Sequence, residues 1–286
     1  MSAVLVTGAS GFIGRALAPS LAQRHEVVCM SRRDPGLGLP WVQGDFSAPE
    51  DLRRLDGFRL GAVVHLAAVT GGCSERGGLL VNVEGTRGLM RYLMDRRCRK
   101  FVMASSIAAV GMQSVRFRPL ALPMPDEHPC LDRDGYGFSK HLMEEVTRYY
   151  HRQDGAIDVI NLRLASVAPD DALPPPQGVG PLGEWALGAI TLMAVSDAVR
   201  AFSLAVEAPL TPGVRVLNAC GPRAWVSAPV SAVLRHWYGE GLDLSWYERP
   251  GHAYDSVYDV RRIAAELGFT ARRLPNDAHP GSQPEG

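Results

Sequence analysis

The stretch that decides the fold is "VLVTGASGFIGRAL", residues Val4–Leu17. A short apolar run ends in three glycines at intervals of three, and a helical pattern follows them. Gly8 permits a tight turn, Gly11 lets the backbone approach a pyrophosphate, and Gly14 allows a helix to pack closely on a strand. The N–H groups at the start of that helix suit phosphate oxygens. We therefore expect a dinucleotide site here, with contacts from Gly8, Ser10, Gly11, Phe12, Ile13 and Gly14.

The rest of the first half repeats this rhythm of short apolar runs and longer helical patterns. Such alternation, with strands apolar on both faces, is typical of a parallel sheet covered by helices on both sides. The sequence predicts a doubly wound α/β (Rossmann) fold. The expected strands are Ala3–Thr7, Glu26–Ser31, Trp41–Gln43, Gly61–Leu66, Lys100–Ser105, Asp158–Leu164 and Val214–Asn218; the expected helices are Phe12–Gln23, Pro49–Leu55, Leu79–Arg96, Gly137–Gln153, Ser196–Glu207, Ser227–Tyr238 and Val260–Leu267.

After residue 165 the rhythm breaks at a stretch rich in proline and glycine, "APDDALPPPQGVGPLGEW". Such a stretch reads as a loop that crosses a cleft. We expect residues 1–165, with returning elements in 194–219, to form the dinucleotide-binding domain. Residues 166–193 and 220–271 would form a small C-terminal substrate-binding region, and 272–286 a disordered tail.

Composition narrows the classes of function. The chain has 286 residues and a formal net charge of zero, so no overall field attracts nucleic acid or an anionic membrane. No apolar run is long enough to cross a bilayer, and the N-terminus lacks the pattern of a signal peptide. Five scattered cysteines and eight dispersed histidines predict reduced thiols, no metal site and a cytoplasmic location.

Further motifs follow in order along the chain: "QGDF" at residues 43–46, "VVHLAAV" at 63–69, "NVEGT" at 82–86, "FVMASSIAAVG" at 101–111 and "YGFSK" at 136–140. Together with the spacing of the first glycines, they resemble the extended short-chain dehydrogenase/reductases, specifically the NAD-dependent epimerase/dehydratase family. The resemblance implies cofactor contacts beyond the glycine turn. These are Asp45, Phe46, Leu66, Ala67, Ala68, Asn82, Ser105, Tyr136, Lys140 and Ala165.

The end of the second strand bears on the choice of cofactor. An acidic residue there would bind the ribose diol of NAD, whereas this chain has Ser31, Arg32 and Arg33. Guanidinium groups suit a 2′-phosphate. We expect NADP as the cofactor, with NAD as the alternative. The structural alternative is that the two arginines form only a solvated basic turn, partly neutralised by Asp34.

Tyr136 and Lys140 lie one helical turn apart, so they project toward the same side. A nearby cation would lower the pKa of the tyrosine, which then exchanges a proton with a substrate hydroxyl. By family register Ser106 orients the reacting oxygen, and Ser105 either supports it or packs near the cofactor. In isolation the tyrosine and lysine would be an exposed helical pair; the ordered motifs favour catalysis.

The substrate is less defined. Ile107 and Ala108 stand where dehydratases of the family carry acids, and no lysine or arginine lies between Arg163 and Arg200 to bind a diphosphate. We therefore expect a small polar or sugar-like alcohol or carbonyl, with contacts from Ser106, Ser166, Trp185 and, for an anionic group, Arg116 beside Arg118. The alternatives are a nucleotide-sugar epimerase that keeps its cofactor bound and a non-catalytic dinucleotide sensor. Helices Leu79–Arg96 and Gly137–Gln153 are apolar on more than one face, which predicts a homodimer.

Overall fold

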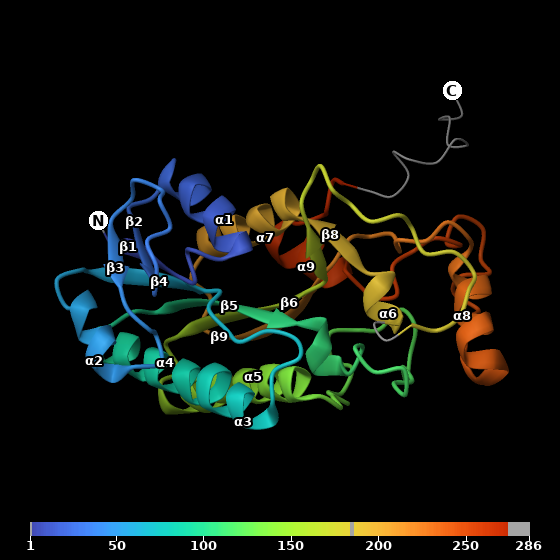
Figure 1. Ribbon diagram of the computed structural model, residues 1–286, viewed down its shortest axis with the longest axis horizontal. Helices are drawn as coiled ribbons and strands as arrows, with labels where there is room; N and C mark the ends of the chain where they lie inside the picture. The colour runs from blue at the N-terminus through green and yellow to red at the C-terminus, as the bar shows by residue number, and fades with distance from the viewer. Residues whose placement is uncertain (1, 184–185, 274–286) are drawn as a thin grey trace.

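A seven-stranded parallel sheet forms the centre of the computed structural model, which describes residues 2–183 and 186–273 (Figure 1). The strand order is β3-β2-β1-β4-β5-β6-β9, so the chain winds outward from β1 in both directions. This is the predicted doubly wound α/β fold. The strands are β1 Ala3–Thr7, β2 Val27–Ser31, β3 Trp41–Gln43, β4 Leu60–His65, β5 Lys100–Ser106, β6 Asp158–Leu164 and β9 Gly213–Ala219.

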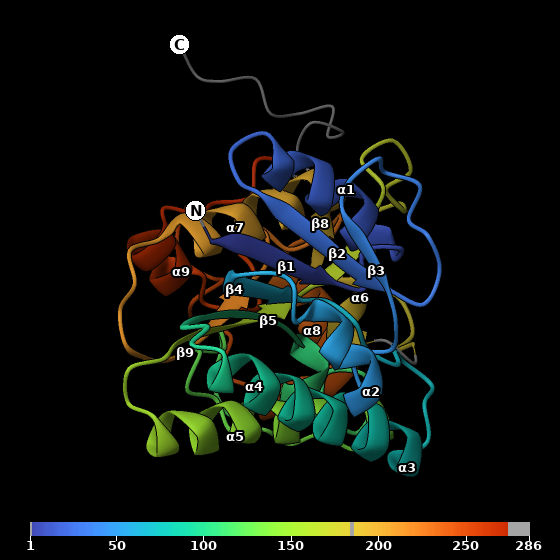
Figure 2. The ribbon, with the colours of Figure 1, turned by 90° about the vertical axis from the view of Figure 1, so that its left-hand side faces the viewer.

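Two apolar layers cover the sheet, and alternate residues of each strand face opposite layers. Val4 and Val6 of β1 face one layer, and Ala3 and Leu5 face the other. Helices α1 (Phe12–Ala22) and α7 (Val195–Glu207) pack on the first face; α2 (Pro49–Leu52), α4 (Gly85–Asp95) and α5 (Gly135–Gln153) pack on the second (Figure 2). Both faces are thus buried, which explains the almost continuous apolar runs of the strands.

The later part of the chain contributes both to the main sheet and to a separate small sheet. Helix α7 packs on α1 in the layer that covers the first face of the sheet, and β9 pairs with β6 at the edge of the sheet. Residues 194–219 therefore return to the main sheet and its first helical layer. A separate two-stranded sheet pairs β7 (Ser166–Ala168) with β8 (Leu192–Ala194). Near it lie α6 (Ala186–Ala189) and, at the far end from β3, α8 (Val230–Tyr238); a final helix, α9 (Arg261–Leu267), packs against β9 and α7 (Figure 1).

Some boundaries differ from those predicted, and local contacts explain them. The single helix expected over Leu79–Arg96 is instead α3 (Glu75–Gly77), a π-helix η2 (Gly78–Glu84) and α4. Helix α5 begins at Gly135, two residues early, because Oδ1 of Asp134 accepts the N–H groups of Tyr136 and Gly137. Helix α8 begins at Val230, after Pro229, rather than at Ser227. The small β7–β8 sheet and a 3-10 turn at Ile107–Val110 (η3) were not predicted.

Among the described residues, no helix is both long and apolar enough to cross a membrane. The predicted disordered tail falls almost wholly outside the described residues.

Candidate active site

The glycine turn after β1 has the geometry that its spacing predicts. Gly8 has a φ of +71°, which favours glycine, and its carbonyl accepts the N–H of Gly11 at 2.9 Å. A Cβ on Gly14 would lie 2.3 Å from the Gly8 oxygen, so only glycine fits there. Helix α1 starts at Phe12 with no side-chain cap at Gly11, which leaves its first N–H groups available to an anion.

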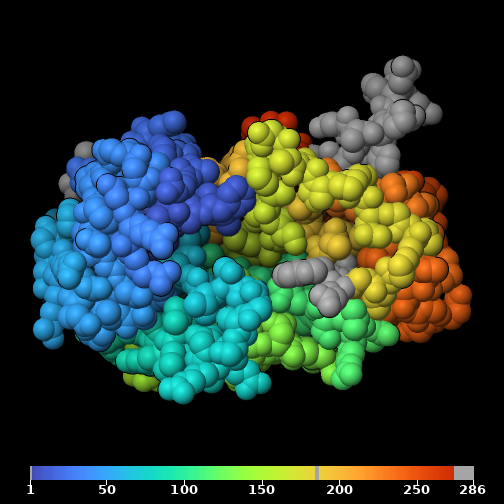
Figure 3. All heavy atoms as spheres, viewed as in Figure 1, coloured from blue at the N-terminus to red at the C-terminus, as the bar shows by residue number. Residues whose placement is uncertain are grey.

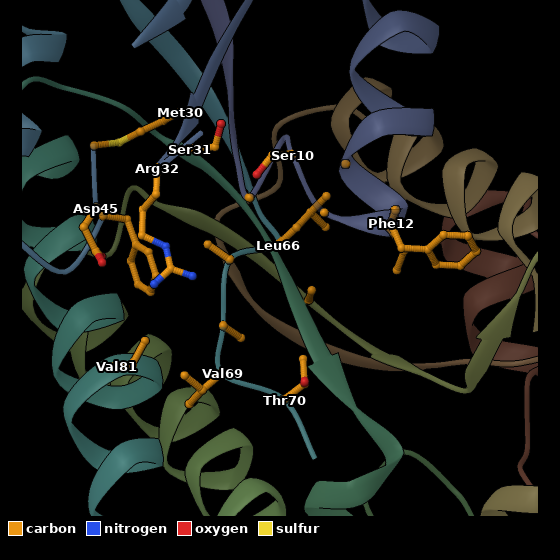
Figure 4. A pocket seen from close by; sticks show the side chains of 18 of the residues that line it. Ser10, Phe12, Met30, Ser31, Arg32, Asp45, Leu66, Val69, Thr70 and Val81 are labelled. Carbon is orange, nitrogen blue, oxygen red and sulfur yellow. The ribbon is translucent and has the colours of Figure 1, made fainter. Parts of the chain in front are cut away.

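A cavity of about 480 Å³ opens beside this turn, at the carboxyl ends of β1, β2 and β4. Figure 4 shows Arg32, Asp45 and Leu66 around it. Most of the predicted cofactor contacts line it; to them the structure adds Met30, Gly44, Val69, Thr70, Val81, Ala104 and Val167. The predicted residues in its wall are Gly8, Ser10, Gly11, Phe12, Ile13, Gly14, Ser31, Arg32, Asp45, Phe46, Leu66, Ala67 and Ala68.

A second, basic hollow of about 520 Å³ adjoins the first and is lined by Ser10, Arg15, Arg32 and Arg33. Sequence reasoning found Arg32 and Arg33 but missed Arg15, four residues after Gly11 within the decisive stretch itself. Across residues 2–183 and 186–273, none of these arginines forms an ion pair. Asp34 forms no ion pair with them among the described residues, and its carboxylate accepts the N–H of Gly36 at 2.7 Å. Ser31 fixes the turn by donating to the carbonyl of Arg33.

Two predicted cofactor contacts have other partners. Asn82 lies in η2, where its side chain exchanges two hydrogen bonds with the backbone of Val69 and donates to the hydroxyl of Ser139. It therefore positions the loop after β4, whose residues line the cavity. Ser105 donates to Glu144 at 2.6 Å, so its hydroxyl faces away from both cavities and supports α5.

Ser106, Tyr136 and the predicted Ala165 and Ser166 meet in a third pocket of about 470 Å³. It shares the wall residues Thr70 and Val167 with the cofactor cavity, so the two cavities adjoin. In Figure 3 the surface is recessed where the blue N-terminal part, the cyan residues and the yellow segment after β6 meet. Sequence reasoning missed Met112 and Gln113, which come from the irregular segment after η3.

The tyrosine and lysine stand together as predicted. The Lys140 ammonium lies 5.7 Å from the centre of the Tyr136 ring and donates to the carbonyl of Ala104 at 2.7 Å. Ser106 closes β5 and caps η3 by accepting the N–H of Ala108 at 3.1 Å. Ala104 lines the cofactor cavity, and Tyr136 lines the third pocket. Ser106, Tyr136 and Lys140 therefore lie where the two cavities meet.

The electrostatics differ from the expectation in one respect. Burial raises the pKa of Tyr136 to about 12, although a hydrogen bond with the Ser106 hydroxyl acts in the opposite direction. Burial also lowers the pKa of Lys140 to about 8, against the attraction of Glu144. The lowering of the tyrosine pKa that we expected from Lys140 is therefore not found in this structure, where burial decides the direction.

One buried histidine beside the site has a structural role. His65 ends β4 and binds the hydroxyls of Thr7 and Thr86, at 2.7 and 3.0 Å. Burial and the charge of Lys140 lower its pKa to about 3, so the ring is neutral at physiological pH. It ties β1, β4 and α4 together under the glycine turn.

The remaining predicted substrate contacts lie elsewhere. Arg116 is exposed and lines none of the three cavities; Arg118 donates to the carbonyls of Val115 and Phe117 and stacks on Tyr238. Trp185 falls outside the described residues. Within the described part of the chain, no cluster of His, Cys, Asp or Glu could hold a metal ion, and the five cysteines are free.

Comparison with known proteins matches residues 4–171, more than half of the chain, to the NAD dependent epimerase/dehydratase family. The chain belongs to this family. Membership of this family, whose description names NAD, indicates a nicotinamide dinucleotide as the cofactor. The cavity, the glycine turn and the helix N-terminus fit such a cofactor.

Individual relatives carry different activities. D-erythronate dehydrogenase of Cupriavidus necator is 30% identical over 58% of this chain and 55% of its own. UDP-glucose 4-epimerase of Neisseria meningitidis is 27% identical over 57% of this chain and 52% of its own. The chain thus spans about half the length of the curated relatives it matches.

Solved structures agree over nearly the whole chain. A short-chain dehydrogenase/reductase superfamily protein of Agrobacterium tumefaciens with bound NAD gives a TM-score of 0.71 at 24% identity, covering 96% of this chain and 93% of that one. MoeE5 in complex with UDP-glucose and NAD gives a TM-score of 0.71 at 26% identity, covering 96% and 95%.

Proposed function

We propose that this protein is an NADP-linked oxidoreductase that interconverts an alcohol and a carbonyl on a small polar substrate. The observation that carries the proposal is that the cofactor cavity adjoins, at Thr70 and Val167, the pocket lined by Ser106 and Tyr136. One cavity offers a phosphate-binding turn, and the other offers a proton donor and a hydroxyl. Residues 166–193 and 220–271 would complete the substrate side.

Each residue of the group has a role that its position supports. Ser106 orients the reacting oxygen, and Tyr136 takes the hydroxyl proton on oxidation or returns it on reduction. The nicotinamide, when bound, accepts or supplies the hydride. Lys140, tied to Ala104, holds a positive charge beside the tyrosine. Because the pKa of Tyr136 is raised to about 12, proton transfer at neutral pH requires further positive charge near the ring.

Three arginines support NADP over NAD. Arg15, Arg32 and Arg33 surround one hollow at the end of β2, and none of them has an acidic partner among the described residues. All three are exposed, and a 2′-phosphate would pair with them through charge-assisted hydrogen bonds. NAD remains the alternative, since several solved relatives contain it.

A second candidate is an epimerase that oxidises and re-reduces one sugar carbon. The matched UDP-glucose 4-epimerases favour it. Against it stand the absence of cations between Arg163 and Arg200 and the acids Asp170 and Asp171 in that segment, which would repel a diphosphate. A dinucleotide sensor without catalysis is the third candidate, and the intact tyrosine and lysine argue against it.

An absorbance assay of added NADPH with a panel of small carbonyl compounds, read at the nicotinamide band, tests the proposal. Net oxidation of NADPH is expected with at least one of them. Retention of cofactor through purification, with no net turnover and with interconversion of a UDP-hexose, would instead establish the epimerase. Cofactor binding with neither reaction would favour the sensor.

We also propose a homodimer built on η2, α4 and α5. Leu80, Phe138 and Tyr149 on these helices are 55%, 36% and 45% exposed, which is costly for a permanently free surface.

A further inference from the structure

The third pocket, which contains Ser106 and Tyr136, has a wall without charge. Its described lining consists of hydroxyl, amide, backbone and apolar groups and contains no lysine, arginine, histidine or acid. These residues are Thr70, Gly71, Ser106, Ile107, Met112, Gln113, Tyr136, Leu164, Ala165, Ser166 and Val167. The undescribed residues 184–185 and 274–286 add no lysine or arginine, as the sequence shows.

Cations near the pocket already have other partners. The Lys140 ammonium is buried and donates to Ala104, on the cofactor side. Arg163, at the end of β6, is buried and donates to both carboxylate oxygens of Glu144, at 2.9 and 2.8 Å. Arg118 is held by two backbone carbonyls and the Tyr238 ring. A substrate carboxylate or phosphate would therefore meet none of them at the pocket wall.

The segment after β7 adds no cation to the pocket: it carries Asp170, which accepts the N–H of Ser196 and pairs with Arg273 at 3.8 Å, and the exposed Asp171. Moving an anion out of water into such a site is unfavourable unless a cation or several donors pair with it. An uncharged polyol needs only hydrogen bonds, and Thr70, Gln113 and Ser166 can supply them.

We infer that the substrate is uncharged: a neutral hydroxy-carbonyl compound of sugar size, bound by hydroxyl and amide groups. This inference rests on the proposed oxidoreductase function and separates this chain from relatives named for acids or for nucleotide sugars. In the reaction, the substrate carbon loses a hydride to the nicotinamide and its hydroxyl loses a proton to Tyr136, which leaves a neutral carbonyl.

Pairs of compounds in which a primary alcohol is replaced by a carboxylate test the inference. The pairs are D-galactose with D-galacturonate, D-glucose with D-glucuronate, and glycolaldehyde with glyoxylate, each assayed with the full-length protein in both directions of nicotinamide turnover. The kcat/KM for the neutral member is expected to exceed that for the anionic member at least tenfold. Equal or higher values for the anionic members would overturn the inference and leave the oxidoreductase function intact.

A substitution that adds charge sharpens the test. Ser166→Arg places a cation in the pocket wall and is expected to raise kcat/KM for galacturonate relative to galactose at least tenfold. Arg116→Ala, outside the pocket, is expected to change this ratio less than twofold; a larger loss with the anionic substrate would show that Arg116 binds it and would overturn the inference. If NADPH binds but no compound of either charge turns over, the proposed function itself fails.

Discussion

At the scale of single residues, Tyr136 is the side chain whose loss should be most specific to chemistry. Its ring lies between the pocket and Lys140, and its hydroxyl is the only proton donor we assign. We expect Tyr136→Phe to lower kcat by about 10²–10⁴, the range usual for one general acid or base. Dissociation constants for NADPH should change less than twofold, because the ring remains.

Tyr149→Phe is the matched control for this experiment. It makes the same chemical change on the same helix, at a tyrosine that is 45% exposed and away from the pocket. Its kcat should equal that of the unaltered protein. A Tyr136→Phe variant as active as the control would refute the proton-transfer role.

The three arginines around the basic hollow carry the second residue-scale prediction. Replacing Arg32 and Arg33 together with alanine should raise the dissociation constant for NADPH at least tenfold, because charge-assisted hydrogen bonds to the phosphate are lost. The constant for NADH should change less than threefold. Titration calorimetry with both dinucleotides measures this ratio.

Arg15→Ala tests whether the third cation belongs to the same site, and it should reproduce part of the loss. Arg53→Ala, an exposed arginine on the 3-10 turn Arg53–Leu55, removes the same charge outside the hollow. Equal losses of NADPH and NADH affinity in the double variant would show that these arginines form only a surface turn.

At the scale of elements, α5 is fixed to the sheet by a buried ion pair. Glu144 accepts from Arg163 on β6 and from Ser105 on β5, and the side chains of Glu144 and Arg163 are 0% and 3% exposed. Removing one partner of such a pair leaves a buried charge. We expect Glu144→Ala to lower the free energy of unfolding by about 3–5 kcal/mol.

Glu145→Ala is the adjacent control, because that carboxylate is 48% exposed and pairs with Arg148 on the surface. Its effect should stay below about 1 kcal/mol. Urea unfolding followed by circular dichroism measures both. A double variant, Glu144→Leu with Arg163→Met, should recover much of the loss, since no charge is then left unpaired; no recovery would mean that the shape of the network matters more than its charge.

Helix α5 and the strands of the sheet show how much of this structure the sequence alone predicts. Strands β1 and β6 match the predicted ranges, because their apolar runs are set by burial on both faces. The placement of Tyr136 and Lys140 on one side of α5 follows from their spacing of one helical turn. The π-helix η2 could not be predicted, since it depends on α5: a Cβ on Gly78 would lie 2.8 Å from the Gly135 oxygen. Likewise, Met112 and Gln113 reach the pocket only through the path of an irregular loop.

At the scale of the whole molecule, apolar side chains lie on the outside of η2 and α5. Leu80 and Tyr149 are 55% and 45% exposed, although helices α4 and α5 also bury a full inner face with Leu89, Met90 and Met143. A helix that is apolar on two sides is expected to pack on two sides. A second copy of the chain can cover the outer side, because a two-fold axis brings the same patch onto itself.

We therefore expect Leu80→Glu combined with Tyr149→Glu to convert a dimer into a monomer, because four carboxylates would be buried in one interface. Sedimentation equilibrium or light scattering measures the mass. Leu210→Glu is the control, since Leu210 is 53% exposed but lies in the loop between α7 and β9 rather than on η2, α4 or α5. A double variant that stays dimeric would place the contact elsewhere. An unaltered protein that is monomeric would refute the proposed dimer. Because Tyr136 opens helix α5, a dimer formed here would also brace the helix that carries the proton donor, and the monomer should lose activity before it loses its fold.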